Sequence, residues 1–262
     1  MLRPRESHNL RLISAAMTIT PTATLSWAED VFGNAVATAV FPTLVDGLVV
    51  DSTAVVQLDA AEWPVFDIAG SAISFPFRYV DDEWTDLGAL TVQQYPDPAG
   101  RLKGWAQAFV RSNPTDTLSL LKDLSLGVSA WAAYQSRDAE GTQTPIETLD
   151  RRIGSCRDFA VLFIEAVRSL GFGARIVSGY LHDTGVSAIG SAGTGSTHAW
   201  AEVFVPGAGW ITFDPTNRSL GGANLIPVAV GRDIRQVMPV IGRFVGASDA
   251  FLGMTVNVSV SV

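Results

Sequence analysis

The sequence predicts an α+β protein in which a β-rich region precedes a larger domain that combines helices with an antiparallel sheet. Three observations support this class: strand-like apolar runs early in the chain, three- and four-residue apolar spacing after residue 113, and strand-like runs again after residue 173. We place a soft boundary near residue 80. It separates a sandwich-like β region over 1–80 from a second domain over 81–262.

The first region carries three candidate strands, over 10–19, 35–41 and 48–58. Asp51 and Ser52 are polar, so we expect them to break the third strand. Between residues 59 and 100 the sequence turns irregular, and its acidic run 81–83 indicates a solvated loop rather than a cation site. We therefore expect a connection between the two domains here.

Composition and charge narrow the possible partners. With 47% hydrophobic and 17% charged residues, the 262-residue chain can bury a sizeable core. The formal net charge is -8 and the only lysines are Lys103 and Lys122, so we expect neither a nucleic acid nor a membrane surface as partner. No apolar stretch of about 18 residues occurs, and none follows the mixed-charge start, which predicts a cytoplasmic protein.

Two helices are predicted ahead of the central one. The segment 113–116 opens a run with a single apolar face, and we expect this helix to end near Gln135. Its apolar positions are Leu118, Leu121, Leu124, Val128 and Trp131. Ser119 and Lys122 match the S-x-x-K motif, but without companion motifs they indicate only a helix surface. A short helical turn is predicted over 145–152.

The central helix begins at Ser155. This residue fits an N-cap, Asp158 can return a bond to the cap backbone as in a capping box, and Gly171 fits a left-handed stop. Nearly every position between them is apolar, so the helix should be buried on most sides. Cys156 occupies its first position.

That position makes Cys156 a candidate nucleophile, because the N-terminus of a helix stabilises a thiolate. Arg157 adds a cation and Asp158 an opposing anion, so local charge alone does not decide the reactivity. As the only cysteine, Cys156 excludes an intramolecular disulfide and a multi-cysteine zinc site. The alternative is a small buried hydrophobic residue, which the position at the helix mouth disfavours.

Strands are predicted over 174–181, 198–205 and 210–214, and the turn 206–209 joins the last two into a hairpin. The small-sided loop 183–197 is a candidate gate for a site. Within this loop, the glycine-rich run from Gly190 to Gly195 lacks the strand and helix of a nucleotide site.

The C-terminal segment 251–262 ends in strict alternation, which predicts a half-buried strand that returns to the N-terminal sheet. Val256, Val258 and Val260 should face inward.

A cysteine nucleophile needs a base and a group that orients it. Among the three histidines, His8 is expected at the surface and His182 as a loop residue, so His198 is the candidate base. If Phe204 pairs with Trp210, His198 lies diagonally from Asp214, within reach of its carboxylate. Glu202 on the same strand face is a weaker alternative for orienting the imidazole.

Three blocks carry a resemblance: 154–160 around Cys156, 198–203 around His198, and 210–217 around Asp214. Together and in this order they closely resemble the motifs of transglutaminase-like cysteine enzymes. The similarity is greatest to a bacterial branch with a β-rich N-terminal region, to whose flanking segments 30–34 and 230–233 are similar.

This resemblance implies a papain-like transglutaminase core, in which the nucleophile helix packs on an antiparallel sheet. Relatives usually carry a further β segment before residue 2, so we expect a shortened start and an exposed edge strand.

The expected activity is acyl transfer or hydrolysis at amide bonds of a protein or peptide, through a thioester. Cys156 attacks, His198 moves the proton, Asp214 holds the imidazole, and the Cys156 N–H serves as oxyanion donor. The thioester then passes to an amine acceptor or to water, and no cofactor is required.

Two other functions stay open. One is a catalytically silent peptide-binding module on the same fold. The other, less favoured, is a metal site formed by His182 and His198 with Asp183 or Asp214.

Overall fold

The computed structural model describes residues 1–137, 141–182, 195–242, 245–247 and 249–261. Its centre is a five-stranded antiparallel sheet with the strand order β12-β11-β10-β9-β13. The strands are β9 (Ala174–Leu181), β10 (Ser196–Val205), β11 (Gly209–Asp214), β12 (Ser219–Leu220) and β13 (Leu225–Gly231). The predicted α+β class, with a helix packed on an antiparallel sheet, is confirmed.

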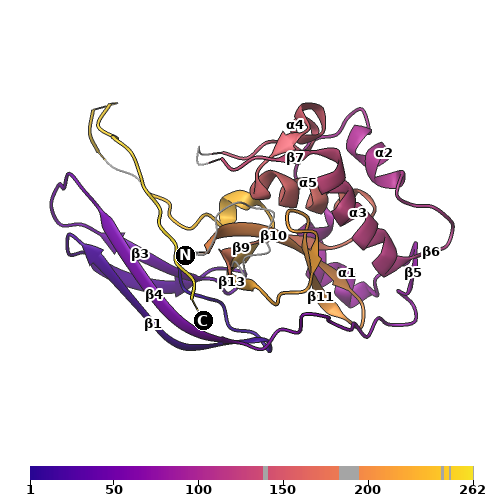
Figure 1. The fold of residues 1–262 in the computed structure, drawn as a ribbon, viewed down its shortest axis with the longest axis horizontal. Helices are drawn as coiled ribbons and strands as arrows, with labels where there is room; N and C mark the ends of the chain where they lie inside the picture. The colour runs from indigo at the N-terminus through magenta and orange to yellow at the C-terminus, as the bar shows by residue number, and fades with distance from the viewer. Residues whose placement is uncertain (138–140, 183–194, 243–244, 248, 262) are drawn as a thin grey trace.

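Helices cover one face of this sheet (Figure 1). The central helix α5 (Cys156–Ser169) packs on β9 and β10 and contacts its helical neighbours, α2 (Arg101–Gln107), α3 (Thr117–Trp131) and α4 (Pro145–Arg151). All its residues from 158 to 168 are buried, as the sequence predicts. In its second half the charged residues Glu165 and Arg168 pair with each other at 2.7 Å, so their burial is compensated.

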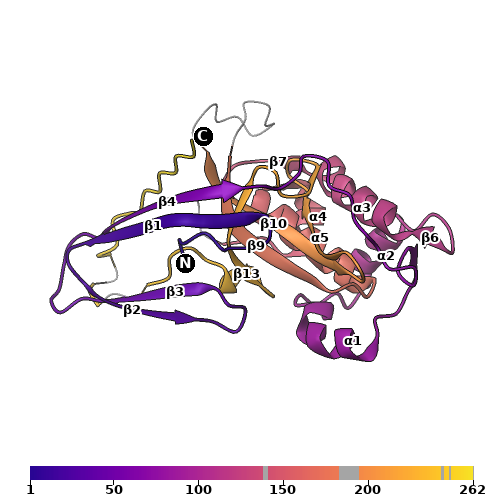
Figure 2. The same cartoon turned by 90° about the horizontal axis from the view of Figure 1, so that it is seen from below.

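The N-terminal strands form two separate two-stranded ribbons (Figure 2). β1 (Leu10–Thr20) pairs with β4 (Val49–Leu58), and β2 (Thr24–Glu29) pairs with β3 (Ala35–Val40). The β2–β3 connection docks on the sheet: Phe32 packs against a small apolar cluster around Trp200. The Asn34 side chain donates to the Val230 carbonyl at 2.7 Å and accepts from the Val230 N–H at 2.9 Å. The β2–β3 ribbon is thereby attached to the edge strand β13.

Several helical predictions need correction. Residues 81–83 are not a loop: they begin α1 (Asp81–Leu87), where acidic side chains suit the positive end of the helix dipole. α3 ends at Trp131, before Gln135, because Ala133 and Tyr134 form the short strand β7 and pair with β8 (Ile153–Gly154). The sequence reasoning also misses α2, which starts after a left-handed Gly100. Two 3₁₀ turns, 88–91 and 234–236, complete the helical content of the described residues.

Two strand predictions are also wrong. β4 continues through Asp51 and Ser52, because both side chains are exposed on the ribbon and need no burial. The described residues 251–261 form no strand. In this segment only Val258 and Val260 are partly buried. Alternating spacing can separate two faces of a strand, but it does not supply a neighbouring strand to pair with.

The segment before residue 80 packs against elements that follow it in the chain. Its short strand β5 (Ser74–Phe75) pairs with β6 (Thr115–Asp116), and the Phe75 ring stacks on Phe172 with centroids 5.4 Å apart. The domain boundary near residue 80 stays a prediction. In the described part of the chain, no helix is long and apolar enough to span a bilayer.

Candidate active site

Cys156 lies at the mouth of α5, directly after β8. The preceding Ser155 is extended, and its N–H donates to the Asp158 carboxylate at 2.8 Å, the return bond of the predicted capping box. Its hydroxyl donates to the same carboxylate at 2.9 Å. These bonds fix the turn that places the sulfur at the start of the helix.

Asp158 is fully buried and has a cationic partner. An Arg137 guanidinium nitrogen lies 2.9 Å from one carboxylate oxygen, and the Gln143 N–H donates to the same oxygen at 2.6 Å. Because Arg137 compensates the charge of Asp158, this carboxylate opposes a nearby thiolate less than its sequence position suggests. No local pattern links Arg137 to α5, so sequence reasoning does not find it.

The β10–β11 hairpin brings the predicted base and carboxylate together. Phe204 pairs with Trp210, which is the register that the sequence analysis assumes. His198 Nε2 lies 2.7 Å from Asp214 Oδ2, and both side chains are buried. The Trp200 ring stacks beside the imidazole with centroids 6.0 Å apart. Packing and hydrogen bonding therefore hold the imidazole in one orientation.

A turn after β11 fixes the Asp214 carboxylate in its place. The N–H groups of Thr216 and Asn217 donate to Oδ1 at 3.0 and 3.2 Å, and the Asn217 side chain donates to Oδ2 at 2.7 Å. Asn217 lies within the third sequence block, yet its contact with Asp214 depends on the turn and is visible only in the structure.

The Cys156 thiol interacts with the His198 imidazole, and each group shifts the pKa of the other. Burial raises the pKa of Cys156, but the hydrogen bond and charge of His198, the Ala199 N–H and Arg157 lower it below the ordinary thiol value overall. Nε2 of His198 contacts Asp214, which leaves Nδ1 for the sulfur.

The pKa shifts of His198 and Asp214 both favour the ionised forms of these groups. Burial opposes the imidazolium, but Asp214 and then Cys156 raise the pKa of His198 to about 10. Burial also opposes the Asp214 anion, but His198 and Asn217 lower the pKa of this carboxyl. The arrangement favours a thiolate and an imidazolium braced by a carboxylate.

The other candidate residues lie apart from this cluster. His8 is exposed in a turn, as predicted. The His182 N–H donates to the Asn224 carbonyl, and Glu202 pairs with Arg175 at 2.7 Å instead of orienting His198.

The described residues do not assemble the alternative metal site of His182 and His198 with Asp183 or Asp214. Asp183 and the loop 183–194, which includes Gly190, Gly193 and most of the candidate gate, lie outside the described residues. Among the residues that are described, no three His, Cys, Asp or Glu side chains are grouped to hold a metal ion.

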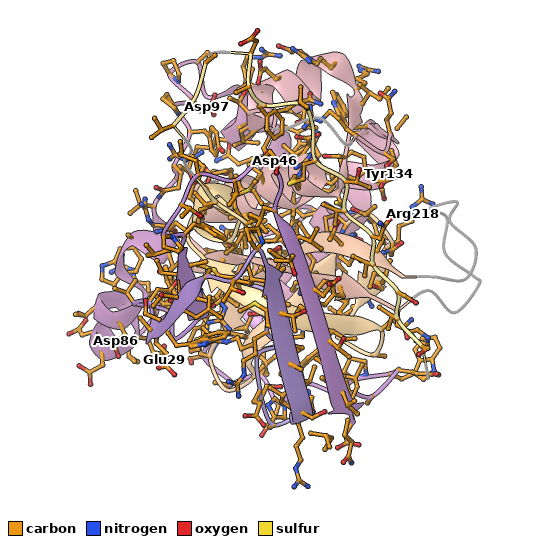
Figure 3. All side chains as sticks on the ribbon, turned by 90° about the vertical axis from the view of Figure 1, so that its left-hand side faces the viewer. Glu29, Asp46, Asp86, Asp97, Tyr134 and Arg218 are labelled. Atoms are coloured by element: carbon orange, nitrogen blue, oxygen red, sulfur yellow. The ribbon has the colours of Figure 1, made fainter. Side chains whose placement is uncertain are left out.

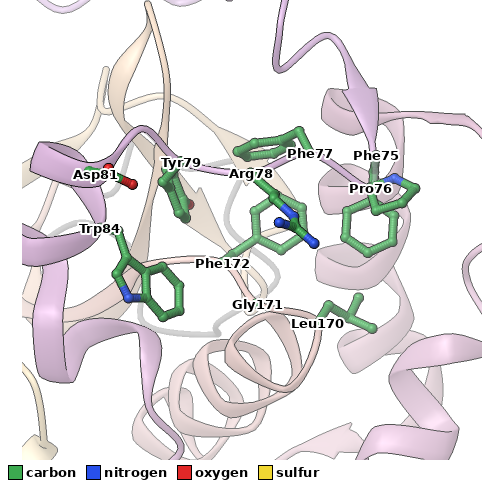
Figure 4. A pocket seen from close by; sticks show the side chains of 10 residues that line it. All are labelled: Phe75, Pro76, Phe77, Arg78, Tyr79, Asp81, Trp84, Leu170, Gly171 and Phe172. Carbon is green, nitrogen blue, oxygen red and sulfur yellow. The ribbon is translucent and has the colours of Figure 1, made fainter.

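An aromatic pocket lies at the other end of α5 (Figure 4). Its cavity of about 350 Å³ is bordered by Tyr79, Trp84, Phe172 and Arg78. Because α5 has 14 residues, about 20 Å of helix separates this pocket from Cys156. The pocket is therefore distant from the Cys156 sulfur.

Family comparison connects this geometry with known sequences. The family model described as "Transglutaminase-like superfamily" matches residues 103–215, which include all three clustered side chains. The model described as "Bacterial transglutaminase-like N-terminal region" matches residues 1–57, which include both ribbons except the end of β4.

Two uncharacterized mycobacterial proteins are similar in sequence. One from Mycobacterium leprae is 35% identical over 138 residues, which cover 51% of this chain and 49% of that protein. One from Mycobacterium tuberculosis is 30% identical over 264 aligned residues, covering 92% of this chain and 79% of that protein. The chain thus matches about half the length of the first relative.

A solved structure shares the fold. The crystal structure of a protein from Cytophaga hutchinsonii superposes with a TM-score of 0.66 at 20% sequence identity. The superposition covers 89% of this chain and 75% of that chain.

Proposed function

Because this chain belongs to the transglutaminase-like superfamily, we propose that it is a cysteine-dependent acyl-transfer enzyme that acts on amide bonds of proteins or peptides. Cys156 is the nucleophile, His198 the proton carrier, and Asp214 the residue that orients His198. One observation carries the proposal: a buried imidazole is hydrogen-bonded to a carboxylate at 2.7 Å and interacts with the thiol at the mouth of α5, whose pKa it lowers.

The first half-reaction forms a thioester. The Cys156 sulfur attacks the carbonyl carbon, the C–S bond forms, and the carbonyl electron pair moves onto oxygen, where the Cys156 N–H donates to it. When the C–N bond breaks, His198 gives its proton to the departing nitrogen. Asp214 stays ionised and stabilises the imidazolium throughout.

The second half-reaction releases the acyl group. An amine or water attacks the thioester carbon, His198 takes a proton from this nucleophile, and the C–S bond breaks to return the thiolate. The amine gives a transamidated product, and water gives deamidation or peptide cleavage. The same three residues serve each ending. A nucleophilic thiol stays reduced in the cytoplasm, which is the compartment we propose for the reaction.

The test is a three-way assay of the full chain on a glutamine-containing peptide and a fluorescent primary amine. Ammonia release, amine incorporation and peptide cleavage are measured in parallel, with Cys156→Ala and His198→Ala as controls. We expect at least one product from the wild type and none from either variant. A wild type that forms no product, with a thiol that is inert to iodoacetamide, would contradict the proposal and favour a silent binding module.

A further inference from the structure

We propose that the Tyr134 hydroxyl is the second oxyanion donor, acting beside the Cys156 N–H on the carbonyl oxygen of the substrate. This inference rests on the proposed function. A backbone N–H satisfies only one lone pair of a tetrahedral oxyanion, and a second directed donor is a large source of rate enhancement in acyl transfer. Tyr134 carries a hydroxyl close to the mouth of α5.

The backbone places Tyr134 beside the nucleophile. β7 and β8 pair in parallel, with Tyr134 opposite Gly154, and the Gln135 N–H donates to the Gly154 carbonyl at 2.9 Å. Neighbouring strands lie about 4.8 Å apart. Cys156 follows Gly154 by two residues, so the length of a tyrosine side chain is enough to reach the sulfur.

The ring is directed toward the first turn of α5. Tyr134 meets Phe159 edge to face, with ring centroids 6.3 Å apart and an interplanar angle of 80°. Phe159 lies three residues after Cys156, on the same helical face. Figure 3 labels Tyr134 in the helical half of the molecule, and its side chain is half-buried. The ring is therefore held by packing while part of it stays accessible.

The electrostatic interactions of the Tyr134 phenol also indicate a position near the candidate active site. Burial raises the pKa of Tyr134 first, the negative charges of Cys156 and Asp214 raise it further, and a hydrogen bond with Ser136 opposes them. The hydroxyl thus lies within the field of both anionic groups of the candidate site and keeps its proton at neutral pH.

The proposed step moves no proton to or from Tyr134. As the C–S bond forms, the carbonyl electron pair becomes an oxyanion, and the Tyr134 O–H donates a hydrogen bond that strengthens with the developing charge. When the oxyanion collapses, this bond weakens and the phenol is unchanged. Tyr134 therefore touches the reacting oxygen and stabilises the transition state more than the ground state.

The test compares two reactions of the same sulfur. Acylation by p-nitrophenyl acetate passes through an oxyanion, whereas alkylation by iodoacetamide displaces iodide at a CH₂ carbon and forms none. For Tyr134→Phe, which keeps the ring against Phe159, we expect acylation to slow about 100-fold. Alkylation should change less than twofold across the pH range. Tyr180→Phe is the matched control, because its hydroxyl donates to the Leu2 carbonyl at 3.2 Å, and both of its rates should equal those of the wild type.

The outcomes separate this inference from the proposed function. Unchanged acylation in Tyr134→Phe, or an equal slowing of acylation and alkylation, would overturn the role of Tyr134. A wild type that is alkylated but never acylated would overturn the proposed function. This second failure is visible without any tyrosine variant.

Discussion

Two buried carboxylates flank the candidate site, and each is 0% exposed. Asp158 is held by the Arg137 guanidinium and by the backbone N–H groups of Gln143 and Ser155. Asp214 is held by His198, a group that gives up and takes back a proton. Equal burial therefore supports two different tasks. Asp158 anchors the helix mouth, whereas we propose that Asp214 orients a proton carrier.

The largest expected effect comes from Asp214→Asn. Asparagine keeps the size of the side chain but removes the charge that stabilises the His198 imidazolium. We expect kcat to fall roughly a thousand- to ten-thousand-fold while the protein stays folded. Steady-state kinetics and circular dichroism of the same sample check both parts. A loss of folding with undiminished activity per folded molecule would assign Asp214 the anchoring task instead.

Asp158→Asn should lower stability more than activity, which is the opposite of the effect of Asp214→Asn. The change leaves the Arg137 guanidinium without its anion in a site where the arginine side chain is 29% exposed. We expect a loss of about 2–3 kcal/mol in the free energy of unfolding, less than for a fully buried pair because water reaches the arginine. Urea denaturation measures this loss. Activity per folded molecule should fall far less than in Asp214→Asn.

The alkaline limb of the pH–rate profile tests the coupling between Asp214 and His198. The raised pKa of His198, about 10, means that the imidazolium needed for leaving-group protonation is lost only as the pH rises through that value. In Asp214→Asn this limb should move toward about 6.5, the ordinary histidine value. An unmoved limb would show that another group controls it.

Asn217→Ala should also lower kcat, but less than Asp214→Asn does. It removes the side-chain donor at 2.7 Å from Asp214 Oδ2 but leaves the two backbone donors on Oδ1. We expect about a tenfold fall in kcat, because the carboxylate loses one of the hydrogen bonds that fix its position. KM should stay within twofold. A fall equal to that of Asp214→Asn would mean that Asn217 acts directly on the substrate.

The smallest effect is expected for Glu202→Gln. This carboxylate shares the β10 strand with His198 but pairs with Arg175 in a partly exposed position. We expect kcat to change less than twofold and the free energy of unfolding by less than about 1 kcal/mol. A kcat loss comparable with that of Asp214→Asn would make Glu202 the orienting residue.

Local signals predict much of the site. The capping residues around Cys156 and the turn 206–209 are encoded within a few residues, and the hairpin register follows from them. This register and the spacing of the two residues suffice to place His198 beside Asp214. The nucleophile and its two proposed partners are therefore accessible from the sequence alone.

Features that depend on non-local pairing do not follow from the sequence. Arg137 reaches Asp158 and Tyr134 packs against Phe159 beside the parallel pair β7–β8, whose strands are two residues long and carry no periodic pattern. The sequence analysis does not predict β13, which pairs with β9, because this strand contains Pro227 and ends at Gly231. For residues 251–261 the alternation is present, but no partner edge follows from it.

The most direct test of the central claim is the rate of Cys156 alkylation by iodoacetamide as a function of pH, in the wild type and in His198→Ala. A thiolate that is stabilised by an imidazolium predicts a wild-type rate that stays high well below about pH 8.5, the ordinary thiol pKa, and an upward shift of this titration in the variant. Identical titrations near the ordinary thiol value in both proteins would contradict the account.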